Sequence, residues 1–379
     1  MTACRKASSI IRTAGRLVSS PRRRWCVGGV AVAVLAALFF AHANLARMGQ
    51  AFLHADWHWL AIALGLMFVS LVLRSVALKV IVDALGGLRA CLGDTFSATS
   101  IGLLANSVIP IRVGTVLAPY TLYVLLRRRG AAVPFATTLG MTLTEQLFAI
   151  ASFVALSLLF VSTLSLPGWA VEVLIASALF AATFLVGGVV LERRRRKLAA
   201  AEGEARTGAA PGVATAARPG GLRRHWPALV DSQRIMGKPW SALLVAAIQT
   251  LAWLIQLAAA WAALQAFHLG GAGLRAAALV IVLTNLIGLV PITPGNVGTF
   301  QAAALAALAV SGVAAGPAVA YALGLQGMQL VVATVAGLAS LSLQDLTLSD
   351  LRGRSLQAAS LLYHGDPVVP TRAEGPVRL

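Results

Sequence analysis

A proline-broken stretch inside an apolar run constrains the fold of this chain more than any other part of its sequence. Residues 283–299 have the sequence LTNLIGLVPITPGNVGT, in which Pro291 and Pro294 separate two apolar runs. Proline lacks a backbone N–H and its ring clashes with the preceding turn, so neither position can continue a helix. Inside a bilayer, broken backbone is tolerated only where protein buries it or where it lines a wet cavity. The stretch is therefore predicted to form the tip of a re-entrant hairpin at a functional site.

An earlier segment shows the same pattern. Residues 101–115 have the sequence IGLLANSVIPIRVGT, in which Asn106 precedes the Pro110-Ile111 pair and a Val-Gly-Thr triplet follows. The later stretch has Asn285, a Pro-Ile pair and the same triplet in the same order. We interpret the two segments as a repeat that forms a second hairpin. The alternative is a pair of ordinary proline kinks in two spanning helices.

The composition places this chain in a bilayer. Of its 379 residues, 58% are hydrophobic and only 12% are charged, whereas about 25% are charged in a soluble globular chain. The net charge is +18, but the basic residues cluster outside the apolar segments, so they favour membrane topology and contact with anionic lipid over nucleic-acid binding. The three cysteines lie far apart and have no metal-ligand spacing. They predict neither a disulfide framework nor a metal or other cofactor site.

Basic clusters set the predicted topology, because positively charged segments stay on the cytoplasmic side. The expected fold is an all-α polytopic membrane protein with about six full transmembrane helices and two re-entrant helical hairpins, or eight spans if each hairpin counts as one. The full crossings are predicted at 26–40, 58–82, 132–161, 170–191, 240–267 and 317–343. The first is interpreted as an uncleaved signal anchor; the alternative is a signal peptide cleaved near Ala41-His42-Ala43.

The hairpins are predicted at 95–126 and 274–313, and they enter from opposite sides of the membrane. Such inverted repeats with broken helices are the architecture of many secondary transporters. Both termini are expected in the cytoplasm of a bacterium, and the protein in its cytoplasmic (inner) membrane. The predicted organisation is a basic N-terminus, a first membrane half, a basic disordered linker, a second membrane half and a cytoplasmic tail, at 1–25, 26–191, 192–239, 240–345 and 346–379.

Several polar side chains lie within the predicted spans. Arg74 lies about 12 Å from the cytoplasmic end of its helix, which favours a protein partner or a polar cavity over lipid. Glu145 lies about 20 Å along its helix, near the middle of the bilayer. It indicates either a substrate or proton path, or a structural ion pair with Arg74 or Arg112. On the fifth span, Gln249, Trp253 and Gln256 share one helix face, which suits either a lipid path or hydrogen bonding between helices.

These motifs resemble the lysylphosphatidylglycerol synthase transmembrane (flippase-type) family over roughly residues 25–345. The most specific piece is Pro291 to Thr299, which looks like the family's P-x-TPGG-x-G signature. The segment from Asn106 to Gly130 looks like its N-x-x-x-P-x-R-x-G-E segment, and Glu145 falls where the family places a Glu-Arg pair. The resemblance implies movement or handling of a polar lipid. It does not extend to aminoacyl-lipid synthesis, because the sequence after residue 345 does not resemble an acyltransferase domain.

The chain also departs from the family pattern. Neutral residues stand where the family usually has a charge, at Thr115, Ala118, Gln146 and Gln301, and Asn296 replaces the second glycine of the signature. These replacements argue against inferring the substrate or the coupling ion from the charged version of the site.

The predicted function is translocation, or flippase-like handling, of a polar phospholipid or an isoprenoid- or glycolipid. In this reading Arg112 pairs with a phosphate, and Glu145 pairs with Arg112 in the empty state or carries a coupling proton. The expected partners are the bilayer and a polar or anionic lipid, and also a lipid-biosynthesis enzyme or a second copy of the chain. The residues expected along the substrate path, with Arg74 as a charge partner, are Asn106, Pro110, Arg112, Gly114, Glu145, Gln146, Asn285, Pro291, Thr293, Pro294, Gly295, Asn296, Gly298 and Gln301.

Two other functions remain open at this stage. The first is a membrane-embedded transferase acting on a lipid-linked substrate. Such an enzyme generally needs an acid, a base or a metal site, and the sequence has no paired-carboxylate motif or other catalytic constellation, so we do not expect an enzyme. The second is a scaffold for a lipid-synthesis complex, in which the basic linker makes the main contact.

Overall fold

The computed structural model describes residues 53–84, 90–108, 114–131, 133–161, 238–288 and 296–344, residues 235 and 346, and short pieces between 168 and 193. Within these ranges every element is helical. The N-terminus predicted at 1–25, the span at 26–40 and nearly all of the linker and tail lie outside the described residues. So do the two proline-containing segments, 109–113 and 289–295.

Four long helices correspond to predicted spans. They are α4 (Trp57–Ala84), α7 (Phe135–Val161), α10 (Pro239–Ala266) and α13 (Ala315–Leu343). Within the part of the chain that the structure describes, five helices are long and apolar enough to cross a membrane: α4, α10, α13, residues Phe135–Leu159 of α7, and a fifth at Gly270–Gly288. The span predicted at 170–191 is described only in pieces, which include a short apolar helix at Val171–Phe180.

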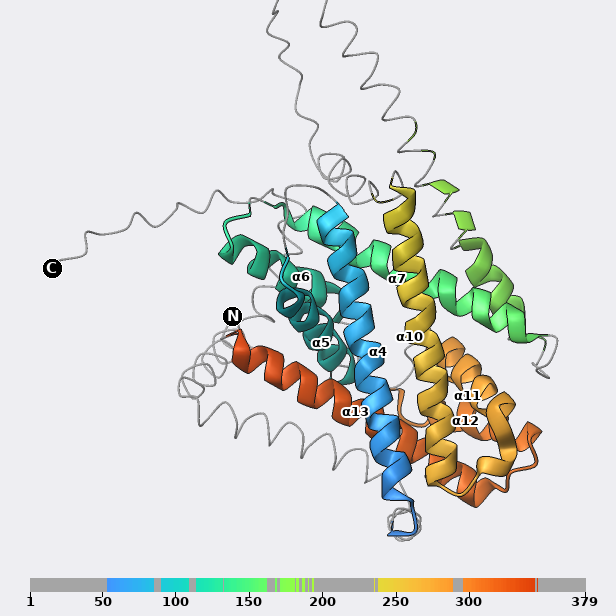
Figure 1. Ribbon diagram of the computed structural model, residues 1–379. Helices are drawn as coiled ribbons and strands as arrows, with labels where there is room; N and C mark the ends of the chain where they lie inside the picture. Colours follow the sequence, from blue (N-terminus) through green and yellow to red (C-terminus); the bar gives the residue numbers. More distant parts are fainter. Residues whose placement is uncertain are drawn as a thin grey trace, which may run out of the picture.

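Helices α4 and α10 form an antiparallel pair through the centre of the molecule (Figure 1). At one end the Asp56 N–H donates to the Ala266 carbonyl at 2.9 Å, and at the other the Lys238 Nζ donates to the Ala84 carbonyl at 2.7 Å. Small side chains fill the contact; Ala252, for example, is fully buried. Small residues let two helix backbones approach closely, which is how helices associate in lipid.

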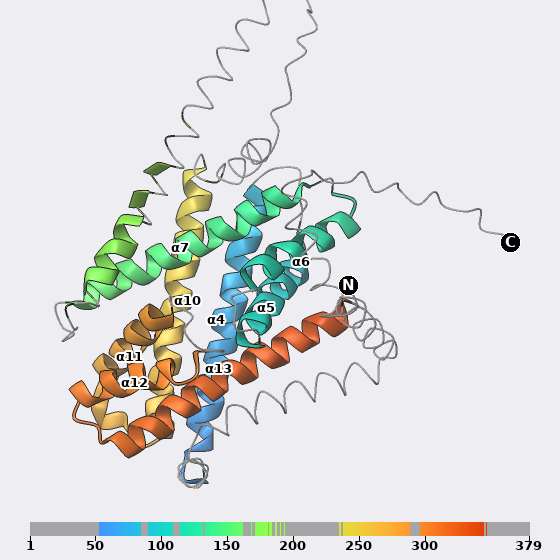
Figure 2. The same ribbon diagram turned by 180° about the vertical axis from the view of Figure 1, so that it is seen from behind.

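The first predicted hairpin is built from α5 (Leu92–Val108) and α6 (Gly114–Arg128), which lie side by side (Figures 1 and 2). At their outer end Arg129 forms a salt bridge of 2.6 Å with Asp94. At their inner end the Gly114 N–H donates to Asn106 Oδ1 at 2.9 Å. The two arms are therefore antiparallel, with the segment 109–113 connecting their inner ends.

The second predicted hairpin is built from α11 (Gly273–Gly288) and α12 (Thr299–Val310), which pack against each other after the short helix η3 (Gly270–Ala272). Helix α12 leads through residues 311–314 into the start of α13. The far end of α13 reaches the first hairpin, where Arg128 donates to the Gln344 carbonyl at 2.7 Å. The outer ends of the two hairpins thus lie at opposite ends of α13.

Candidate functional site

A cavity of about 690 Å³ lies where the inner ends of the two hairpins meet the long helices. Its lining comes from α4, α7, α10 and α13 and from both arms of each hairpin. The volume falls in the range of about 300–1,000 Å³ that is typical of ligand pockets. The two repeated sequence segments, 101–115 and 283–299, therefore both contribute residues to the lining of one cavity.

Several residues predicted for the substrate path line this cavity together with Arg74: Asn106, Gly114, Glu145, Gln146, Asn285 and Asn296. Six others lie outside the described residues: Pro110, Arg112, Pro291, Thr293, Pro294 and Gly295.

Gly298 and Gln301 are not among the residues that line this cavity, and their place on the substrate path stays a prediction. Gln301 instead holds the first turn of α12, where its Oε1 accepts the Gly298 N–H at 2.6 Å. Its amide also donates to Gln326, which does line the cavity. The first backbone N–H groups of a helix have no partner within the helix, and Gln301 satisfies one of them, so it stabilises the start of α12.

At the tip of the first hairpin the backbones of α5 and α6 lie close together. A side chain at Gly114 would place its Cβ 2.0 Å from the Gly102 carbonyl and 2.5 Å from Asn106 Oδ1. Asn106 is a fixed acceptor for the Gly114 N–H, and its amide nitrogen is left for the cavity. Asn106 therefore both connects the two arms of the hairpin by a hydrogen bond and lines the cavity.

The tip of the second hairpin depends on an asparagine in a left-handed conformation. Asn296 has a φ of 57°, which L-residues rarely adopt and which Gly and Asn tolerate best. Its carbonyl accepts the Thr299 hydroxyl at 3.0 Å at the start of α12. This explains how Asn296 can stand where the family signature has glycine.

This conformation makes Asn296 a test of the tip geometry. Asn296→Gly is expected to leave stability unchanged or slightly raised, whereas Asn296→Ala should cost about 1 kcal/mol, because alanine is strained at positive φ. Thermal unfolding of the two purified variants in the same detergent measures the difference. An alanine variant as stable as the glycine variant would show that position 296 does not adopt this conformation.

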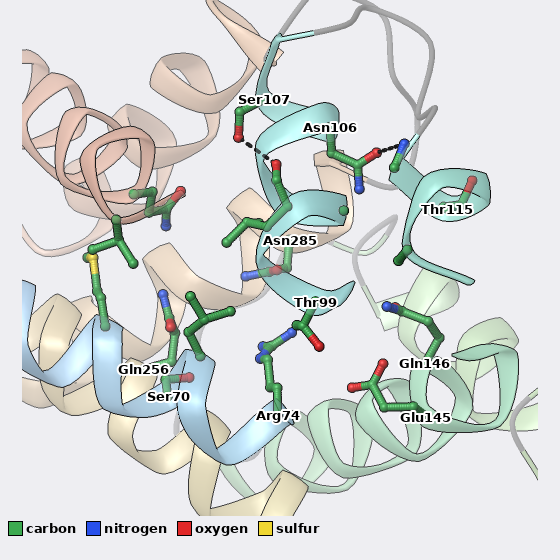
Figure 3. A pocket seen from close by; sticks show the side chains of 18 of the residues that line it. Ser70, Arg74, Thr99, Asn106, Ser107, Thr115, Glu145, Gln146, Gln256 and Asn285 are labelled. Atoms are coloured by element: carbon green, nitrogen blue, oxygen red, sulfur yellow. Dashed lines mark hydrogen bonds between the residues drawn. The ribbon is translucent and has the colours of Figure 1, made fainter. Parts of the chain in front are cut away.

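The cavity holds one charge of each sign among its described lining residues, Arg74 and Glu145. Glu145 is only 6% exposed, and both side chains line the same cavity. Glu145 Oε1 accepts a hydrogen bond of 2.6 Å from the buried Gln249 amide. The Arg74 guanidinium lies 4.7 Å from the centre of the Trp253 ring, a cation–π distance. Figure 3 shows Arg74 and Glu145 on either side of one space.

The position of Arg74 is relevant to the two alternatives predicted for Glu145, a substrate or proton path and a structural ion pair. Of the two arginines considered as partners, Arg74 faces Glu145 across the cavity without forming a salt bridge with it, and Arg112 lies outside the described residues. Because both Arg74 and Glu145 also line the cavity, a structural pair and a substrate-facing pair are compatible with one arrangement.

The polar stripe on α10 serves two purposes. Gln249 and Trp253 bind α7, Gln249 through Glu145 and Trp253 through a hydrogen bond of 2.9 Å from its Nε1 to the Ala149 carbonyl. Gln256 instead lines the cavity, as Trp253 also does. Hydrogen bonding between helices, one of the two predicted alternatives, is therefore present, and the lipid path stays a prediction.

Sequence reasoning missed several polar lining residues: Ser70, Thr99, Ser107, Thr142, Gln326 and Gln329. A signal existed for the last two, since glutamines three residues apart share one helix face and are rare within an apolar span. Thr115, Ala118 and Gln146, where the family usually has charges, also line the cavity. Neutral side chains therefore surround the Arg74–Glu145 pair.

Comparison with known proteins identifies a family. The family model described as the lysylphosphatidylglycerol synthase TM region matches residues 25–337. The match covers most of the chain and confirms the resemblance predicted from its motifs. No curated protein and no solved structure matches the chain.

Proposed function

Because the chain belongs to the lysylphosphatidylglycerol synthase TM region family, which implies a multi-pass membrane protein involved in lipid handling, we propose that it moves the headgroup of a polar lipid across the membrane. The shared cavity is the observation that carries this proposal. A headgroup crossing hydrocarbon loses its water, at a cost of a few kcal/mol for each unsatisfied polar group. A polar cavity at the hairpin tips would replace part of that hydration.

The proposal includes re-entrant hairpins in an inverted arrangement. It is supported by the outer ends of the hairpins, which lie at opposite ends of α13, and by their inner ends, which line one cavity. Irregular backbone at membrane depth needs such a setting, because lipid offers it no hydrogen-bond partner. With about six full crossings, both termini would then face the cytoplasm of a bacterial cell, at the membrane face that carries Arg127 to Arg129.

In the proposed mechanism the Arg74–Glu145 pair keeps the empty cavity neutral. An entering lipid would exchange hydrogen bonds with the cavity amides and compete for the Arg74 guanidinium, whose planar donors suit oxyanions. Glu145 would remain the counter-charge, or carry a coupling proton. Where the transported lipid carries a phosphate, Arg112 is proposed as its partner.

We also propose that the protein is not a transferase. The acids nearest the first hairpin, Asp83 and Asp94, were the groups such an enzyme could use. Each is engaged away from the cavity: Asp83 pairs with Lys79, and Asp94 pairs with Arg129 and accepts the Cys91 N–H at the start of α5. No observation favours the scaffold alternative, whose main contact surface, the linker, lies almost entirely outside the described residues.

A cavity-blocking substitution tests the proposed path. Leu143→Trp places a bulky ring in the cavity, whereas Leu159→Trp, on the same helix α7, places it on the outer surface, where Leu159 is 70% exposed. We expect the first variant to slow lipid translocation roughly tenfold, corresponding to about 1.4 kcal/mol in the barrier, and the second to leave the rate unchanged.

The measurement uses vesicles that contain the full-length protein and lipids with a fluorescent acyl chain. A membrane-impermeant quencher then reports the exchange of labelled lipid between leaflets. Equal rates for Leu143→Trp and Leu159→Trp, or no acceleration over protein-free vesicles, would count against the proposal.

A further inference from the structure

We infer, resting on the proposed function, that the cavity receives an uncharged headgroup rich in hydroxyls, such as the sugar of a glycolipid, in preference to an anionic phosphate or a cationic amine. The inference names the substrate class of the same site. It follows from the charge balance of the cavity and from the hydrogen-bonding capacity left on its lining.

The charge balance of the cavity favours a neutral headgroup. Among the described lining residues Arg74 and Glu145 are the only charged ones, and they oppose each other. An anionic group attracted to Arg74 is repelled by Glu145. A cationic group is attracted to Glu145 and repelled by Arg74. In a poorly solvated site neither charge can be left uncompensated cheaply. A neutral group disturbs this pair least.

Three glutamines supply the recognition. Gln146, Gln256 and Gln329 come from α7, α10 and α13 and line the cavity, and none forms a side-chain hydrogen bond with the described part of the chain. Figure 3 shows Gln146 and Gln256 entering the space from opposite sides. An amide both donates and accepts, as a hydroxyl does, whereas a phosphate only accepts and an ammonium group only donates. A hydroxyl-bearing ring could therefore satisfy these amides from several directions.

Several hydroxyls of the lining have already donated their hydrogen to a backbone carbonyl. The Thr99 and Ser107 hydroxyls donate to carbonyls of their own helix at 2.9 and 3.0 Å, and the Asn285 amide nitrogen donates to the Ile281 carbonyl at 2.8 Å. Ser70 likewise donates to the Ala252 carbonyl at 3.0 Å. The three hydroxyls therefore present oxygen acceptors to the cavity, while the second N–H of the Asn285 amide and the Asn106 amide nitrogen remain as donors. Oxygen acceptors bind hydroxyl donors and repel phosphate oxygens, which favours a sugar or polyol over a phosphate.

The test compares two lipids in one vesicle assay. Full-length protein is reconstituted with acyl-labelled glucosyldiacylglycerol or acyl-labelled phosphatidate, and exchange between leaflets is followed by quenching. We expect the protein to accelerate exchange of the glucolipid at least roughly tenfold more than that of phosphatidate. Trapped glucose is measured in parallel, because a free sugar has the same chemistry as the headgroup.

Matched variants locate the effect. Gln256→Met with Gln329→Met keeps side-chain size and removes both amides, and it should slow the glucolipid roughly tenfold while phosphatidate exchange is unchanged. Gln256→Asn alone should retain most of the rate. Leu254→Met, at a position on α10 that is 41% exposed and outside the cavity lining, is the control. Thermal unfolding of each variant verifies that it folds.

The outcomes separate this inference from the proposed function. Faster exchange of phosphatidate, or glucolipid exchange that is unaffected by the double glutamine variant, would overturn the inference and leave lipid translocation standing. Glucose release without glucolipid exchange would overturn the assignment to a lipid headgroup. Exchange of neither lipid above protein-free vesicles would overturn both proposals.

Discussion

Removing either charge of the Arg74–Glu145 pair alone is expected to destabilise the protein by about 3 kcal/mol, because the remaining charge is left without its partner in a low-dielectric site. Glu145→Gln changes little except the charge, since the new amide oxygen can still accept the hydrogen bond from Gln249. Arg74→Met keeps an unbranched apolar side chain beside Trp253. The double variant should recover most of the loss, since no uncompensated charge remains.

The free energy of unfolding of the wild type, both single variants and the double variant, from denaturant titration in one detergent, forms a double-mutant cycle. The control is Lys79→Met, which breaks the more exposed Lys79–Asp83 pair on α4 and should cost no more than about 0.5 kcal/mol. If the double variant loses the sum of the two single losses, the two charges are not coupled. Single variants as mild as the Lys79 control would show that water in the cavity screens the pair.

The sequence was sufficient for the long helices of the described residues, because their signals are local. The span predicted at 58–82 corresponds to α4 (Trp57–Ala84), and the hairpin predicted at 95–126 corresponds to α5 and α6, which span residues 92–128. Long apolar runs need the length of a membrane span, and a proline disfavours a helix by removing a backbone donor, although Pro119 lies inside α6. Such features can be predicted without knowing which helices touch.

The partners of the buried charges could be predicted only as alternatives. Helical rise placed Glu145 deep in its span, but it could not choose between Arg74 and Arg112 as its partner. That choice depends on how α4, α7 and α10 pack, and it is the packing that brings Gln249 and Trp253 to the pair. Side-chain spacing along one helix carries no information about its neighbours.

The polar residues near the second hairpin show a different limit. Gln301 was predicted as part of the path, and in the structure it caps α12 and donates to Gln326. Gln326, which lines the cavity, was not predicted. A polar residue in the first turn of a helix can satisfy backbone N–H groups or face a ligand, and a sequence motif does not distinguish the two.

Gly114→Ala is expected to destabilise the protein by about 3 kcal/mol, of which overpacking contributes about 2 and a lost hydrogen bond about 1. The added Cβ would lie 2.0 Å from the Gly102 carbonyl, which is backbone and cannot rotate away as a side chain could. The start of α6 must therefore move away from α5, and the bond from the Gly114 N–H to Asn106 is strained or broken. Because Gly114 and Asn106 both line the cavity, the rate of lipid translocation should fall together with the free energy of unfolding.

The matched control is Gly65→Ala in α4, where an added Cβ meets nothing within 4 Å. There alanine should raise stability by as much as about 1 kcal/mol, since glycine is the poorer helix former. If glycine-to-alanine lowers the free energy of unfolding at position 114 and raises it at position 65, the cost at position 114 comes from the contact between the two arms and not from the loss of a glycine. A Gly114→Ala variant that unfolds with the wild-type free energy would mean that α5 and α6 do not approach this closely, and the first hairpin would then need a different inner end.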